Sequence, residues 1–217
     1  MITSDPYRTP FSVVAEEVRR LSRSDRRMLL VVAKEILGNE RSRMNEEQRV
    51  GAVKLIVALL PDSAETILSW VKSKTGRGVH EVQFTLFCFL DQARFLPGAE
   101  RFAIKVPQIV EDYLNHVRAE TSQAAWMAGD LLGDHLPVSD GLPVLLRSAR
   151  SAKFVAGRAG ALHGLEHVLG RLKVGSYRSN RVVTLLREIS VHDKSLRLRA
   201  IALYLLEEER KREDAAS

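Results

Sequence analysis

The sequence has a single cysteine among 217 residues, so it cannot form an internal disulfide. It also has no long apolar run: residues 51–60, GAVKLIVALL, are about half the roughly 20 residues that a helix needs to cross a bilayer. The first 20 residues are polar, acidic and interrupted by proline, unlike a secretory signal. We therefore expect a cytoplasmic protein with no membrane span. We also expect Cys88, in the apolar stretch FTLFCFL, to be buried and unreactive.

Nucleotide-binding motifs are missing as well. The sequence contains no G-x-x-x-x-G-K-[ST], no G-x-G-x-x-G and no C-x-x-C pattern. The stretch KTGRG at residues 74–78 lacks the length and the lysine placement of a phosphate-binding loop. These absences argue against nucleotide hydrolysis and dinucleotide redox chemistry, and we expect no cofactor.

Glycine and proline rarely interrupt the apolar stretches, but they lie between them, as helix boundaries require. The stretches that they separate have about 12 to 20 residues, which is too long for typical strands. The predicted helices are residues 11–22, 24–38, 45–60, 62–74, 80–96, 100–118, 121–135, 140–151, 154–170, 177–190 and 194–212.

A repeat of about 36 residues connects these segments. Small residues recur at Ala52, Thr85, Ala125, Ala161 and Ala200, and several have arginine three positions before and leucine or glycine three positions after. This spacing places them on one side of a helix, where a small side chain lets a second helix approach closely. We therefore predict that Ala161 and Ala200 are buried, and that residues 194–212 are helical although LRLRAIAL alternates like a strand.

The repeated segments DKSLRLRAIAL (193–203) and KFVAGRAGALHGL (153–165) resemble the second helix of HEAT repeats. That resemblance implies an all-α fold, a right-handed α-α superhelix of about five helix pairs beginning near residues 24, 62, 100, 140 and 177. Residues 11–22 would form an N-terminal capping helix. The whole chain, 1–217, would be one solenoid domain with a flexible N-terminus (1–10) and a charged tail (210–217). A nonrepetitive helical bundle is the alternative.

Positive charge is concentrated in residues 147–181, which contain eight basic residues and one acidic residue, Glu166. Residues 121–146, in contrast, contain three aspartates and no basic residue. A clustered positive charge attracts nucleic acid, an acidic protein or an anionic membrane, and Tyr177 adds an aromatic ring that can stack on a base. A basic surface that only keeps the protein soluble is the alternative. The predicted anion-binding residues are Arg147, Arg150, Lys153, Arg158, Arg171, Lys173, Tyr177, Arg178 and Arg181.

The sequence HGLEH, from His163 to His167, matches the H-x-x-E-H pattern of inverted zinc proteases. Two histidines one helical turn apart can bind one zinc ion. A zinc enzyme needs a further ligand, however, and such proteases normally have a mixed α/β fold. We therefore predict no metal site, and interpret His163 and His167 as partly exposed side chains of a repeat helix.

The sequence WMAGD places Trp126 and Asp130 one turn apart on a predicted second helix, and Arg158 and Tyr204 lie on later ones. This arrangement is similar to the HEAT-repeat alkylpurine DNA glycosylases. The resemblance implies that Trp126, Asp130 and Tyr204 surround a damaged nucleotide and that Arg158 holds a phosphate. A second clear concave tryptophan is missing. We therefore predict a noncatalytic interaction module for an anionic macromolecule, with a DNA glycosylase as the alternative.

Overall fold

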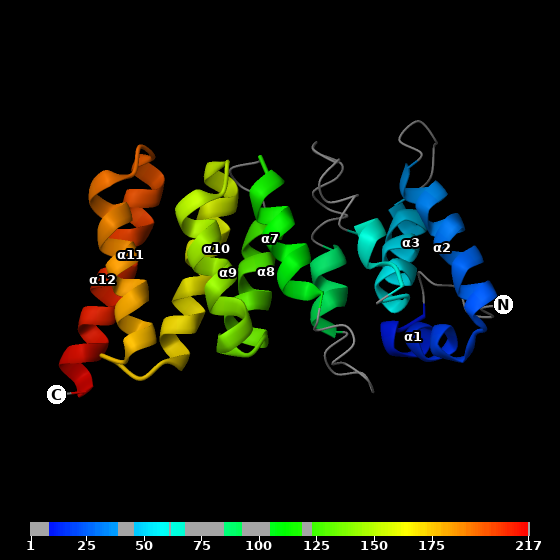
Figure 1. Ribbon diagram of the computed structural model, residues 1–217, viewed down its shortest axis with the longest axis horizontal. Coiled ribbons are helices and arrows are strands. Elements are labelled where there is room, and N and C mark those ends of the chain that lie inside the picture. The colour runs from blue at the N-terminus through cyan, green and yellow to red at the C-terminus, as the bar shows by residue number, and fades with distance from the viewer. Residues whose placement is uncertain are drawn as a thin grey trace. The chain divides into compact units, whose positions relative to one another are not determined.

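The structure is a computed structural model whose regular secondary structure is helical throughout the residues that it describes (Figure 1). These are residues 9–38, 46–60, 62–67, 85–92, 105–118 and 123–216. No strand occurs in these ranges, which confirms the predicted all-α class. The chain forms two compact units, Met1–Ile109 and Val110–Ser217, and each is described by itself.

The described part of the first unit is built around helix α3. Its helical segments are α1 (Phe11–Arg20), α2 (Arg23–Gly38), α3 (Glu46–Ala58), residues 64–67 and residues 85–92. Helix α3 packs against both α1 and α2, and residues 51–60 are all buried because this segment is apolar on every side. Lys54 is buried among them, where its Nζ donates a 2.7 Å hydrogen bond to the Thr9 carbonyl and lies 5.3 Å from the Phe89 ring centre.

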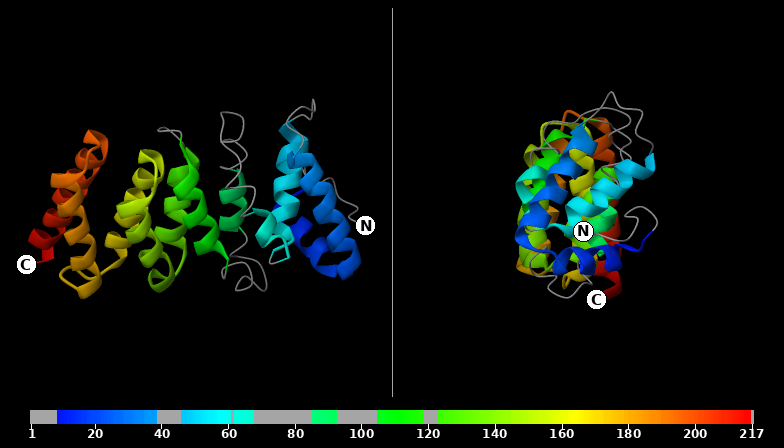
Figure 2. Two further views of the ribbon diagram at one scale, coloured as in Figure 1. Left: turned by 45° about the horizontal axis from the view of Figure 1, so that its top comes forward. Right: turned by 90° about the vertical axis from the view of Figure 1, so that its right-hand side faces the viewer.

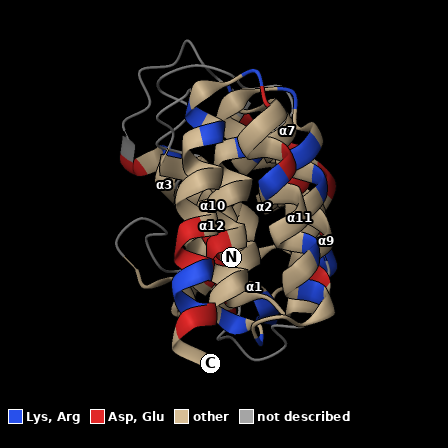
Figure 3. Ribbon diagram, turned by 90° about the vertical axis from the view of Figure 1, so that its left-hand side faces the viewer, with Lys and Arg blue, Asp and Glu red and all other residues tan. Residues whose placement is uncertain are grey.

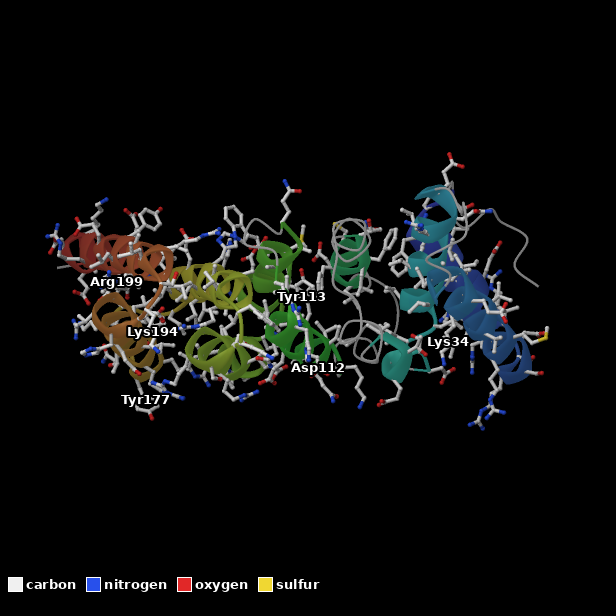
Figure 4. The ribbon with its side chains drawn as sticks, turned by 90° about the horizontal axis from the view of Figure 1, so that it is seen from above. Lys34, Asp112, Tyr113, Tyr177, Lys194 and Arg199 are labelled. Atoms are coloured by element: carbon white, nitrogen blue, oxygen red, sulfur yellow. The ribbon has the colours of Figure 1, made fainter. Side chains whose placement is uncertain are left out.

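The second unit consists of helices that run alternately up and down (Figures 1 and 2). Helices α7, α9 and α11 lie in one layer and α8, α10 and α12 in the other, so that α10 contacts α8, α9 and α12 (Figure 4). The elements are α7 (Val106–His116), which begins in the first unit, α8 (Gln123–Asp130), the π-helical turn η1 (Leu131–His135), α9 (Val138–Ser151), α10 (Val155–Arg171), α11 (Tyr177–His192) and α12 (Leu196–Ala216).

In the layer formed by α8, α10 and α12, two arginines donate hydrogen bonds to backbone carbonyls at the end of the preceding helix. Arg171, at the end of α10, donates from Nη1 to the carbonyls of Gly133 (2.7 Å) and Leu136 (2.9 Å), which follow α8. Arg212, in α12, donates in the same way to the carbonyls of Leu169 (2.6 Å) and Leu172 (3.1 Å) at the end of α10. Carbonyls at the end of a helix often lack a partner within that helix, so each arginine supplies donors to the end of the preceding helix.

The helices of the second unit follow the predicted ranges closely. The predicted segments 140–151, 154–170 and 177–190 correspond to α9, α10 and α11 within two residues at each end. The predicted helix 194–212 corresponds to α12, which begins two residues later, at Leu196, and continues to Ala216 through most of the predicted tail. The predicted helices 62–74 and 80–96 lie largely outside the described residues, and so do residues 1–8 of the N-terminus.

The small residues of the repeat are buried at only some positions. Ala52, Ala125 and Ala161 are each at most 1% exposed, and the prediction for Ala161 is confirmed. The prediction for Ala200 is wrong, because Ala200 is exposed. Helix α12 packs on α10 and α11 through Leu198 and positions three to four residues further along, so Ala200, two residues after Leu198, lies on the other side of the helix.

Cys88 is half-buried, so the prediction of a buried thiol is also wrong. It lies in the helical segment 85–92, where the buried positions are Leu86, Phe87, Phe89 and Leu90. These four residues share one side of the helix, and Cys88 lies on the opposite side, where it is only partly shielded from solvent.

Within the described residues, every helix is too short or too polar to span a bilayer.

Candidate functional site

Half of the eight basic residues in 147–181 have acceptors within the second unit. Arg147 makes a two-point ion pair with Glu111, at 2.8 Å from Nε to Oε1 and 2.9 Å from Nη2 to Oε2. Arg150 Nη2 lies 2.9 Å from Glu188 Oε2. Both pairs are solvent-exposed, so each contributes only about 0 to 1 kcal/mol to stability, but each lowers the positive charge of the surface. Glu111 and Glu188 lie outside residues 147–181, so the net charge calculated for that segment does not include them.

Arg158 and Arg171 are used inside the fold. Arg158 Nε donates to the Ala149 carbonyl at 2.9 Å, and its guanidinium bonds the carboxylate of Asp193 in the α11–α12 connection. Asp193 is 5% exposed, so this ion pair is largely shielded from water. Arg171 holds the two carbonyls that follow α8. Both guanidiniums therefore already have acceptors within the chain.

The remaining cations occupy two separate places. Lys173, Arg178 and Arg181 lie in the loop before α11 and in its first turns, where Lys173 and Arg178 have no ion pair with a described residue. Lys153 precedes α10, and its Nζ lies 5.5 Å from the Phe154 ring centre. Helix α10 has 17 residues, which corresponds to about 25 Å and separates Lys153 from the other three. The predicted surface is therefore reduced to the start of α11.

We define the α11 surface as Lys173, Tyr177, Arg178 and Arg181. Tyr177 is 77% exposed and projects outward from its unit (Figure 4). The Arg181 guanidinium lies 5.9 Å from its ring centre, within cation–π distance. Figure 3 shows the Lys and Arg positions on α9 and α11. An exposed aromatic ring thus lies among basic side chains.

A pocket of about 370 Å³ opens between α9 and α11 beside this surface. Arg150 and Leu146 line it from α9, and Tyr177, Asn180 and Arg181 line it from α11 together with Thr184 and Leu185. Asn180 and Thr184 already donate to backbone carbonyls, and Arg150 pairs with Glu188. Among the lining cations, Arg181 has no ion pair with a described residue, so it is the one that an anionic group of a partner could meet.

The N-terminus of α11 adds to the positive potential. Ser176 is the N-cap, and its Oγ accepts a 3.3 Å hydrogen bond from the Ser179 backbone N–H. The first turn contains no acidic residue, and Arg178 and Arg181 lie close to the positive end of the helix dipole. Cations at this end oppose the dipole and cost stability. An anion bound there would be attracted both by the two arginines and by the helix dipole.

A second cluster lies where α8 and α10 approach most closely. Gly129 and Gly133 face Gly160 and Gly164, and a Cβ at any of these four positions would overlap the backbone of the facing helix. This close approach brings Asp130, next to Gly129, toward histidines of α10. The turn η1, which follows Asp130, is π-helical, a rare conformation that occurs frequently at functional sites.

Asp130 lies between two imidazole rings. Its Oδ1 is 2.9 Å from His163 Nε2 and 3.0 Å from His167 Nε2, and Glu166 Oε2 is 3.4 Å from His163 Nδ1. The contact with Asp130 raises the pKa of His163 above its ordinary value against the opposing effect of burial. Burial acts to raise the pKa of Asp130, but His163 and the charges of His167 and His135 outweigh it and lower that pKa.

Trp126 lies on the same side of α8, one turn before Asp130. It is 51% exposed, and its ring centre is 5.3 Å from that of His163. Tyr204 on α12 is 55% exposed and makes no ring contact with another described residue. Trp126 and Asp130 therefore contact the histidines of α10, and not Tyr204 or Arg158. Sequence patterns identified the Trp126–Asp130 pair and the His163–His167 pair separately. Only the packing of α8 against α10 brings the two pairs together.

No protein-family model, curated protein or solved structure matches the chain.

Proposed function

We propose that the chain is a HEAT-like α-solenoid that acts as a noncatalytic binding module for an anionic macromolecule. In this proposal the α11 surface holds the partner. An acidic protein and a nucleic acid are both suitable partners, because their shared property is dense negative charge. The expected location is the cytoplasm.

The helix order of the second unit supports the solenoid. Consecutive helices alternate between two layers, as stacked helix pairs require. The contact of Arg171 with the end of α8 is repeated by Arg212 with the end of α10. A bond that recurs from one pair to the next is expected of repeats and not of an irregular bundle.

The observation that carries the binding proposal is the position of the uncompensated cations. Four of the predicted arginines bond acceptors of the same chain, yet Lys173, Arg178 and Arg181 remain together beside the N-terminus of α11. All three residues are exposed, and Arg181 lines a pocket together with the exposed Tyr177. Keeping three cations at the positive end of a helix is unfavourable for folding alone, and a bound anion would offset that cost.

Charge reversal tests the proposal. We expect the variant Lys173→Glu, Arg178→Glu and Arg181→Glu to lose most of its affinity for fluorescent duplex DNA, for polyglutamate, or for both, at physiological salt. The loss should be tenfold or more, because three weak contacts disappear and three repulsive ones replace them.

The matched control reverses Arg23, Arg27 and Lys34, three exposed cations of α2 (Lys34 is labelled in Figure 4). It changes the net charge by the same amount but leaves the α11 surface intact, so its binding should stay close to that of the parent. Equal losses in both variants would show that binding depends only on the net charge of the protein and not on the α11 surface. Full binding by the α11 variant would disprove the proposed surface.

An alkylpurine DNA glycosylase is the second candidate, favoured by the exposed Trp126 one turn before Asp130. In such an enzyme the carboxylate of Asp130 would have to face the substrate. In the structure its Oδ1 faces two imidazole rings. Release of the base from a duplex with one alkylated purine, and its loss in Asp130→Asn, would support this activity.

A further inference from the structure

We propose that Asp130, His163 and His167 form a binding site for a divalent transition metal, with Zn²⁺ the ion that the ligands fit best. The site lies on α8 and α10, away from the α11 surface, and is independent of the binding function proposed above. The sequence offered two histidines without a further ligand. The fold supplies that ligand as Asp130, from a segment more than 30 residues earlier.

The ligand atoms already converge. One potential ligand atom from each of the three residues lies within 4.8 Å of the other two. Zinc binds imidazole nitrogen and carboxylate oxygen at about 2.0 to 2.2 Å, so ligand atoms around a tetrahedral ion are about 3.3 Å apart. The 2.9 and 3.0 Å contacts of Asp130 Oδ1 need to open by only a few tenths of an ångström to admit the ion.

The carboxylate oxygen lies beside two ring nitrogens but has no well-aligned hydrogen bond. Asp130 Oδ1 is buried, and although two ring nitrogens are close, neither ring directs an N–H at it well enough for a hydrogen bond. A buried acceptor without a hydrogen bond is costly. A cation held by the two ring nitrogens and this oxygen would replace the missing hydrogen bond.

The neighbouring side chains suit a metal site. Glu166 Oε2, 3.4 Å from His163 Nδ1, is placed to orient that ring and to favour coordination through Nε2. The ring of Trp126 lies tilted against that of His163, with the ring centres 5.3 Å apart. The three ligands are between about one quarter and one third exposed, so the ion could be reached from solvent. Three protein ligands leave a fourth position for water or a partner's donor atom.

Calorimetric titration of the chelator-treated full chain with ZnCl₂ tests the site. We expect one ion per chain, and affinity at least tenfold lower in each of the variants His163→Gln, His167→Gln and Asp130→Asn. His192→Gln removes an exposed histidine of α11 and should leave the affinity unchanged. Glu166→Gln should weaken binding by about 10- to 100-fold if its carboxylate orients the ring.

A spectroscopic readout separates this site from adventitious binding. The chain has two tryptophans, so Trp70→Phe leaves Trp126 as the only one. In that variant Co²⁺ should quench the fluorescence beside His163 and produce visible absorption typical of four or five ligands. Both signals should disappear on adding His163→Gln, while circular dichroism stays unchanged. Absence of binding, or binding that survives loss of Asp130 and both histidines, would overturn the proposal.

Discussion

Cys88 shows how partial burial controls the chemistry of one residue. Burial, with a smaller contribution from the negative charge of Asp91, raises the pKa of this thiol above its ordinary value. The thiolate is the reactive form, and below the pKa its fraction falls roughly tenfold per pH unit. Half-burial therefore predicts a thiol that reagents can reach but that is mostly protonated at neutral pH.

We expect iodoacetamide to alkylate Cys88 several-fold more slowly in the native protein than in the urea-unfolded chain at pH 7.5, because only the unfolded thiol has an ordinary pKa. The native rate should continue to rise with pH beyond the point at which the unfolded rate levels off. Mass spectrometry of timed samples measures both rates. Equal rates at pH 7.5 would contradict this explanation.

Ala161 and Ala200 occupy equivalent positions in the predicted repeat but differ in burial. Ala161 is 0% exposed, and Ala200 is exposed. We therefore expect Ala161→Leu to lower the free energy of unfolding by about 1 to 3 kcal/mol through overpacking. Ala200→Leu should change it by no more than about 0.5 kcal/mol. Urea denaturation followed by circular dichroism compares the two, and equal destabilisation would show that the side of α12 assigned to Ala200 is wrong.

At the scale of elements, the contact between α8 and α10 depends on glycine. A Cβ on Gly160 would overlap the Ala125 carbonyl, whereas a Cβ on Gly170, at the end of the same helix, meets no atom within 4 Å. Alanine substitution at both positions therefore distinguishes two effects on stability. At Gly170 only the helix preference of alanine acts, whereas at Gly160 the steric overlap with α8 acts as well. The same close approach also brings Asp130 to the histidines.

We expect Gly160→Ala to destabilise the protein by about 1 to 3 kcal/mol, because α8 and α10 must move apart. Gly170→Ala should stabilise it by about 0.4 to 1 kcal/mol, because alanine restricts the unfolded chain and fits the helix. Denaturant unfolding of both variants is the measurement. A stabilising Gly160→Ala would mean that the helices are not in contact there.

Helix positions could be predicted from the sequence, but most side-chain partners could not. The spacing of apolar residues and the position of glycine and proline depend on local structure, and they gave α9, α10 and α11 nearly to the residue. The pairing of Arg147 with Glu111, or of Asp130 with His163, depends on which helices meet. These partners are more than 30 residues apart in the sequence, and local sequence patterns do not show which helices pack together.

For the whole molecule, the net charge of +6 is a poor guide to the surface that can bind an anion. Internal acceptors engage Arg147, Arg150, Arg158 and Arg171, so far fewer cations remain than the sequence count suggests. The cations of the α11 surface remain for a partner. This restricts the number of phosphate contacts that one duplex could make there to about three.

The salt dependence of DNA binding tests this account most directly. Three phosphate contacts predict that the logarithm of the association constant falls with the logarithm of salt concentration at a slope of about −2.7 on duplex DNA. The variant with Lys173, Arg178 and Arg181 changed to Glu should show a slope near zero, while the Arg23, Arg27 and Lys34 reversal should keep the parental slope. The same slope in the parent and in the α11 variant would contradict the assignment of the anion-binding surface to α11.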